Sequence, residues 1–117
     1  MNDDIVIYHN PRCSKSRATL QLLEERGVEP QIIEYLKTPP STSRLKELLA
    51  MLDMSPRDLM RKGEDPYKDL GLIDTDKDDD TLVAVMVDNP ILIERPIVVT
   101  GGKARLGRPP EQVLEIL

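Results

Sequence analysis

Residues 5–36 decide the fold, and they read IVIYHNPRCSKSRATLQLLEERGVEPQIIEYL. The stretch opens with a short apolar run, residues 5–8, which is typical of a buried strand. A helical stretch follows over residues 14–26, and Gly27 stands where the C-terminus of a helix favours a left-handed residue. Residues 31–36 predict a second strand. Strand, helix and strand within this length form a βαβ unit, so we expect parallel strands with a right-handed crossover.

The middle of the chain, about residues 41–89, is predicted to be helical. Leucines recur there with the i, i+3, i+4, i+7 spacing of one helix face, and Ser41 or Thr42 is suited to cap that helix. These leucines are Leu45, Leu48, Leu49 and Leu52. A largely acidic stretch over residues 76–80 predicts a solvated loop that caps a further helix over residues 81–88.

The last part of the chain changes to β-structure. Residues 97–100 are β-branched and predict a strand, and the glycine pair at 101–102 predicts a tight turn. Residues 103–106 are expected to pair back as a hairpin, before prolines 109 and 110 begin a last helix. The order is therefore β-α-β, helices, β-β-α. Because a chain of 117 residues buries one core, we expect a single domain over residues 1–117.

The composition excludes several classes of protein. Apolar residues make up 39% and charged residues 32%, which is typical of a soluble globular chain. The formal net charge of -5 and the scarcity of aromatic residues disfavour nucleic acids and anionic membranes as partners. No apolar run approaches the ~18 residues of a membrane span, and the polar residues before the first strand lead us to expect no signal peptide. One cysteine forms no internal disulfide, so we expect a cytoplasmic protein.

Cys13 lies between the first predicted strand and the start of the first helix. Backbone N–H groups and the helix dipole converge at such a point, and both favour an anion. Arg12, Lys15 and Arg17 add positive charge beside it. We therefore interpret the thiol as a reactive thiolate with a lowered pKa. The alternative is a small buried apolar residue, for which a polar and basic loop is a poor position.

Two familiar thiol motifs are absent. A Cys-x-x-Cys dithiol has its second cysteine where Ser16 stands, and a tyrosine-phosphatase-type loop has arginine where Thr19 stands. The Ser16 hydroxyl is placed one turn on from the Cys13 sulfur and is expected to donate to it. His9 has two interpretations that remain open: an imidazolium that stabilises the thiolate, or a ring that bonds local backbone and shapes the turn. No second cysteine or histidine has ligand spacing, so no metal site is expected.

Five blocks of sequence resemble the glutaredoxin-dependent arsenate reductase (ArsC) family, in the family's order and over nearly the whole chain. The blocks are HNPRCSKSR (residues 9–17), YLKTPP (35–40), LMRK (59–62), NPILIERPIVV (89–99) and RLGRP (105–109). The loop around Cys13 is most similar to the short chromosomal branch of the family. The resemblance implies a thioredoxin-like (glutaredoxin-like) fold, with a helical insertion between an N-terminal βαβ part and a C-terminal ββα part. It also implies a cis bond between Arg95 and Pro96.

The same resemblance implies a site. One cysteine and three arginines carry the family's chemistry, and their motifs match Cys13, Arg61, Arg95 and Arg108. Guanidinium groups bind the oxygens of a tetrahedral oxyanion, such as arsenate, with paired hydrogen bonds. Cys13 is then the nucleophile that forms a cysteine–arsenate adduct, and the helix N-terminus and the arginines stabilise it.

Reduction of arsenate to arsenite takes two electrons from thiols, and this chain has one thiol. The family takes the others from glutathione and glutaredoxin, so these are the expected partners, with glutathione as co-substrate and no tightly bound cofactor. Two alternatives remain. A glutathione-dependent monothiol/disulfide reductase of the same fold fits Cys13 and Ser16 equally well. A transcription regulator of the Spx type fits less well, because its redox switch is usually a Cys-x-x-Cys pair.

Overall fold

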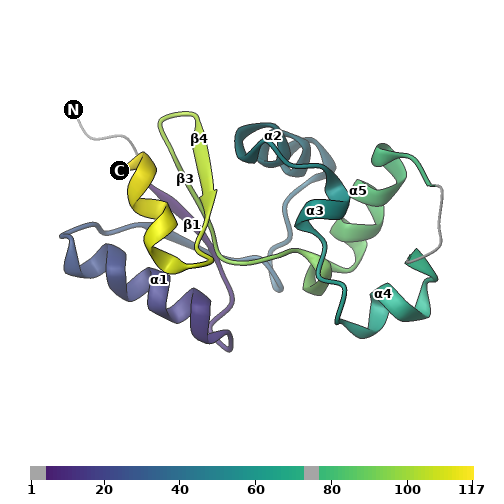
Figure 1. Ribbon diagram of the computed structural model, residues 1–117, viewed down its shortest axis with the longest axis horizontal. Helices are drawn as coiled ribbons and strands as arrows, with labels where there is room; N and C mark the ends of the chain where they lie inside the picture. Colours follow the sequence, from purple (N-terminus) through teal and green to yellow (C-terminus); the bar gives the residue numbers. More distant parts are fainter. Residues whose placement is uncertain (1–4, 73–76) are drawn as a thin grey trace. The chain divides into compact units, whose positions relative to one another are not determined.

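The computed structural model describes residues 5–72 and 77–117, and two compact units make up the chain (Figure 1). The first unit combines residues up to Thr38 with Arg95–Leu117, and the second unit is Pro39–Glu94. The elements are β1 (Val6–His9), α1 (Ser14–Glu25), β2 (Gln31–Glu34), α2 (Thr42–Leu52), α3 (Pro56–Leu59), α4 (Asp65–Asp69), α5 (Asp79–Asp88), η2 (Pro90–Leu92), β3 (Ile97–Thr100), β4 (Lys103–Leu106) and η3 (Pro110–Ile116).

A four-stranded sheet with the order β2-β1-β3-β4 forms the first unit. Strand β1 pairs with β2 in parallel, and β3 is antiparallel to both β1 and β4. The predicted βαβ unit and the predicted C-terminal hairpin are therefore both confirmed. Gly101 and Gly102 have φ angles of 57° and 75°, as a two-residue hairpin turn with positive φ at both positions requires.

The core of the first unit lies between the sheet and two helices, α1 and η3. Ile7 of β1, Val98 of β3, Leu23 of α1 and Val113 of η3 are all fully buried against one another. Each such side chain contributes roughly 1.5–3 kcal/mol by leaving water. This packing fixes the start of α1 relative to the end of β1 and the start of β3, next to which the predicted site residues Cys13 and Arg95 lie.

The second unit is helical, as predicted. Three of the four leucines predicted to face the core from α2 are buried, Leu45, Leu48 and Leu49, and α2 contacts α5. The fourth, Leu52 at the end of the helix, is half-buried. Ser41 caps α2 by accepting the N–H of Arg44, and a capping box formed by Ser55 and its partner Asp58 starts α3. None of the helices in residues 5–72 and 77–117 has the length and apolar character of a membrane span.

Several boundaries differ from the prediction. Strand β2 ends at Glu34 rather than at residue 36, because the chain turns there and Lys37 donates its N–H to the Glu34 carbonyl. Helix α5 begins two residues early, at Asp79, because Asp78 acts as its N-cap and accepts the N–H of Thr81. The last helix is a 3-10 helix, and η2 was not predicted. Residue 76 of the acidic stretch lies outside the described residues.

Candidate active site around Cys13

The loop between β1 and α1 places Cys13 as the N-cap residue of α1. The Asn10 carbonyl accepts the Cys13 N–H at 3.0 Å, and the Asn10 side chain accepts the Arg12 N–H at 3.0 Å. The Cys13 carbonyl accepts the N–H of Arg17, which begins the helical ladder. The half-buried sulfur therefore sits where the first N–H groups of the helix point outward.

The surroundings lower the pKa of the Cys13 thiol below its ordinary value. Partial burial, the largest influence, acts in the opposite direction and raises it. This is outweighed by hydrogen bonds to the sulfur from the backbone N–H of Ser16, the Arg95 side chain and the backbone N–H of Lys15, together with the charge of Arg95. The helix N-terminus and one arginine thus stabilise the thiolate.

The basic residues of the loop itself act differently from the prediction. Arg17 turns back and donates from Nη1 to the Pro11 carbonyl at 3.0 Å. Lys15 contributes its backbone N–H to the sulfur, whereas the arginine that acts on the thiol, Arg95, comes from the far end of the chain. The positive charge that acts on the Cys13 thiol therefore comes from Arg95, whereas the sequence pattern had pointed to Arg12, Lys15 and Arg17.

His9 and Ser16 form a buried pair beside the cysteine. The His9 Nδ1 lies 2.7 Å from the Ser16 hydroxyl oxygen, and the same oxygen accepts the Asn10 N–H at 3.0 Å. Burial lowers the pKa of His9, with Glu34 opposing and Arg17 reinforcing the shift. Burial therefore favours the neutral ring, in which Nδ1 accepts the hydroxyl hydrogen of Ser16 when the ring proton is on Nε2.

This pair corrects the expectation for Ser16 and bears on the two interpretations that were open for His9. The Ser16 hydroxyl bonds to His9 and not to the sulfur, because the side chain is fully buried and faces the end of β1; the backbone N–H of Ser16 contacts Cys13 instead. The lowered pKa of His9 disfavours the interpretation as an imidazolium that stabilises the thiolate. Its observed partner is also a side chain rather than the local backbone.

Arg95 is buried, with 8% of its surface exposed, and lies at the start of the segment that leads into β3. The Arg95–Pro96 bond is cis, as the family resemblance implied, and the Arg108–Pro109 bond is cis as well, which was not predicted. The Arg108 Nη1 donates to the Arg95 carbonyl at 3.0 Å. The structure thus brings Cys13, Arg95 and Arg108 into one connected region of the first unit.

Thr19 and Gly107 hold this region together, and sequence reasoning missed both. The Thr19 hydroxyl is fully buried and lies 2.9 Å from the Lys15 carbonyl and 3.5 Å from that of Gly107. Gly107 donates its N–H to the Pro96 carbonyl at 3.0 Å. A Cβ at Gly107 would lie 2.7 Å from Pro96 and would also collide with Thr19. The one available signal was an isolated glycine directly after a strand, which is typical of close backbone approach.

Arg61, the third predicted oxyanion ligand, lies in the second unit and has two acidic partners. Its Nε is 3.1 Å from Glu64 and its Nη1 is 2.7 Å from Glu94. Burial lowers the pKa of Arg61, but the two carboxylates outweigh this and raise it overall. Neither acid was singled out from the sequence, and the oxyanion role of Arg61 stays a prediction.

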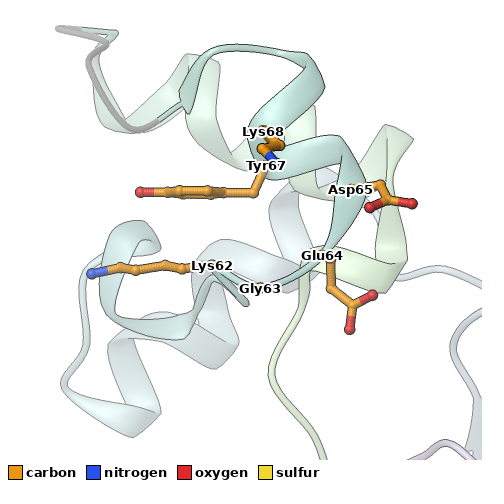
Figure 2. Close-up of a pocket in the computed structure, with 6 residues that line it drawn as sticks. All are labelled: Lys62, Gly63, Glu64, Asp65, Tyr67 and Lys68. Carbon is orange, nitrogen blue, oxygen red and sulfur yellow. The ribbon is translucent and has the colours of Figure 1, made fainter.

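A cavity of about 330 Å³ adjoins this cluster in the second unit. Figure 2 shows the Lys62 side chain and the Tyr67 ring extending in the same direction, with the carboxylates of Glu64 and Asp65 on the other side. The residues that line it are Lys62, Gly63, Glu64, Asp65, Tyr67 and Lys68. None of these is a predicted site residue. Within residues 5–72 and 77–117 there is no group of three or more side chains suited to hold a metal ion.

A family model described as the ArsC family matches residues 8–116. The chain belongs to the ArsC family. It is 58% identical over 118 residues to the uncharacterized protein YfgD of Escherichia coli K12, covering 100% of this chain and 99% of that one. It is 51% identical over 114 residues to the arsenate reductase of the same organism, covering 97% of this chain and 81% of that one.

The solved structures agree with this assignment. The arsenate reductase from Vibrio cholerae superposes with a TM-score of 0.96 at 56% sequence identity, over 100% of both chains. ArsC proteins have a thioredoxin-like fold, and the sheet order, the βαβ unit and the C-terminal hairpin of this ArsC chain conform to it. The predicted fold class is therefore confirmed, including the helical segment between its two halves.

Proposed function

We propose that this chain is an arsenate reductase, with Cys13 as nucleophile and with glutathione and glutaredoxin as external thiols. The observation that carries the proposal is the position of the Cys13 sulfur, which accepts backbone N–H groups from the first turn of α1 and a donor of Arg95. Such surroundings favour a thiolate and also attract a small anion. Relatives named arsenate reductase support arsenate as that anion.

In the proposed first step the Cys13 thiolate attacks the arsenic atom of arsenate. A sulfur–arsenic bond forms, one arsenic–oxygen bond breaks, and that oxygen leaves as water after it takes up a proton. Arg95 and the N–H groups at the start of α1 stabilise the charge on the remaining oxygens. Arg108, which is tied to the Arg95 carbonyl, is proposed as a second donor to the oxyanion.

The reduction itself takes up two electrons, which two thiols release when they join as one disulfide. Arsenate and two thiols thus give arsenite, one disulfide and water. Cys13 is the single cysteine of the chain, so at least one further thiol must come from outside. Glutathione as co-substrate and glutaredoxin as its partner supply these thiols in our proposal. Such thiols are kept reduced in the cytoplasm, where we place the protein.

A second candidate is a glutathione-dependent monothiol reductase of mixed disulfides. The half-buried Cys13, with its lowered pKa and no second cysteine, suits this reaction as well. Its thiolate would attack a disulfide sulfur, form a mixed disulfide and be released by glutathione. The two functions differ in their need for an oxyanion site.

The decisive experiment follows NADPH oxidation in the presence of glutathione, glutaredoxin and glutathione reductase. We expect the rate to depend on arsenate and to fall to background with the Cys13→Ser variant. Turnover of a glutathionylated peptide without any effect of arsenate would select the monothiol reductase. An arsenate-dependent rate no higher than that of Cys13→Ser would exclude the arsenate reductase.

A further inference from the structure

Arg61 is held by two carboxylates that reach its guanidinium from different parts of the second unit. Glu64 accepts from Nε at 3.1 Å, and Glu94 accepts from Nη1 at 2.7 Å. The side chains of the three residues are 22%, 28% and 23% exposed for Arg61, Glu64 and Glu94. Ion pairs that are this sheltered are screened less by salt than those on an open surface.

The placement of the two acids matters for the binding of anions. A guanidinium binds a carboxylate or a tetrahedral oxyanion best through two parallel N–H groups on one edge. It has a side edge that contains Nε and an end edge that contains Nη1. Glu64 occupies a donor of the first edge and Glu94 a donor of the second. A paired contact to another anion therefore requires that Arg61 gives up one of its carboxylates.

The backbone holds this arrangement in place. Met60 and Ile93 form an antiparallel bridge, the Arg61 N–H donates to the Leu92 carbonyl at 2.6 Å, and the Glu94 N–H donates to the Leu59 carbonyl at 2.8 Å. Arg61 and Glu94 thus lie on adjacent, paired backbone segments.

Glu64 is anchored separately. It is the N-cap residue of α4, and it follows Arg61 by three positions, so the two form a local ion pair. Both carboxylates are therefore fixed near the guanidinium before any anion arrives.

We propose that Glu64 and Glu94 are specificity-determining residues that hold Arg61 in ion pairs and so weaken the binding of doubly charged tetrahedral oxyanions to this chain. The inference rests on the proposed function, which supplies the class of substrate. It adds to that function a statement about affinity: while both acids are present, Arg61 contributes little to the binding of the anion. The acids add negative charge and occupy the donors that an oxyanion needs.

The test measures binding by calorimetry, with arsenate and with sulfate, which is not reduced, as probes of the full chain. Glu64→Gln and Glu94→Gln keep the size of each side chain and remove its charge. We expect each to tighten the dissociation constant about threefold, and the double variant to tighten it about tenfold. Glu47→Gln is the matched control, because it removes a carboxylate from the exposed Arg44–Glu47 pair of the same unit. It should leave the constant unchanged.

Arg61→Gln separates the proposal from a general effect of charge. As a single substitution it should change the dissociation constant by less than about twofold. Added to the double variant Glu64→Gln/Glu94→Gln, it should abolish the tighter binding of the anion. A large loss of affinity in Arg61→Gln alone, or a gain that survives without Arg61, would overturn the proposal. Circular dichroism shows whether each variant is folded. If the double variant does not fold, the binding test is made with either single glutamine variant.

Kinetics keep this proposal apart from the proposed function. If the chain reduces arsenate, the glutamine variants should lower KM and leave kcat nearly unchanged. Reduction with unaltered KM and unaltered sulfate binding refutes the role of the acids and leaves the function standing. Absence of reduction together with the predicted change in sulfate binding refutes the function and leaves the role of the acids standing.

Discussion

The side chain of Arg95 donates a hydrogen bond to the sulfur of Cys13, although the two residues come from opposite ends of the chain. Arg95 begins the segment that leads into β3, and Cys13 ends the loop that follows β1. These strands are direct neighbours in the sheet. Strand pairing therefore places Arg95 next to the N-terminus of α1. The Cys13 thiol lies there beside both a positive charge and backbone N–H donors.

The first prediction concerns Arg95→Gln, which keeps a donor but removes the charge. The pKa of Cys13 should rise, because the thiolate loses a charged hydrogen bond. The ultraviolet absorbance of the thiolate, followed through a pH titration, measures this. Arg44→Gln, which changes a half-exposed arginine of the other unit, should leave the titration curve in place. Equal pKa values in wild type and Arg95→Gln would contradict the role given to Arg95.

The second prediction concerns pH and His9. Burial lowers its pKa below the ordinary value of 6.5, so the folded state binds fewer protons than the unfolded state just below that pH. The contribution of His9 to the free energy of unfolding is fully present above pH 6.5 and is lost as the pH falls through the folded-state pKa. In His9→Asn this part of the pH dependence should disappear. Unfolding by denaturant at a series of pH values measures it.

The comparison is simple because the chain contains one histidine. Carboxylates titrate mostly at lower pH and affect wild type and variant alike. Parallel curves of unfolding free energy against pH for the two proteins would show that His9 is not the buried neutral group described above.

The third prediction concerns Gly107. Gly107→Ala should destabilise the protein by about 2 kcal/mol or more, because the added methyl group collides with Thr19 and Pro96. The Cys13 pKa should rise as well, since these contacts support the segment that carries Arg95. Gly63→Ala is the control, because a Cβ there meets nothing within 4 Å. Thermal unfolding of both variants gives the comparison, and equal melting temperatures would refute the proposed contact.

The fourth prediction concerns Thr19. Thr19→Val keeps the shape of the side chain but removes the hydroxyl that donates to the Lys15 carbonyl. We expect the free energy of unfolding to fall by about 1–2 kcal/mol. Thr19→Ser retains the hydroxyl and should restore most of the lost stability. Denaturant unfolding of the two variants measures the difference. If the serine variant were no more stable than the valine variant, the hydrogen bond would have no part in holding the start of α1.

Local signals in the sequence predicted the elements of the fold well. The apolar run of β1, the positive-φ Gly27 after α1 and the glycine pair of the hairpin each act over a few residues. The position of Cys13 at a helix start follows from the same local pattern, because a strand that breaks into a polar loop leaves the thiol outside the core. Strand pairing then followed from chain direction and connection length.

The contacts that define the site were not predictable in the same way. The partners of Arg61 include Glu94, which is 33 residues away, and the contact between Thr19 and Gly107 spans 88 residues. The hydroxyl of Ser16 was expected to bond to Cys13, three residues before it, but its partner is His9, seven residues before it in a different element. Packing between distant segments sets such contacts, and no spacing rule along one chain encodes them.

The most direct test of the account is the pKa of Cys13, measured with and without sulfate. We expect a value below the ordinary pKa of a cysteine thiol in the absence of the anion, because the helix N-terminus and Arg95 stabilise the thiolate. Saturating sulfate should raise it, because a bound anion competes for the same donors and repels the thiolate. An ordinary pKa that sulfate does not change would contradict the claim that Cys13 lies in an anion-binding site.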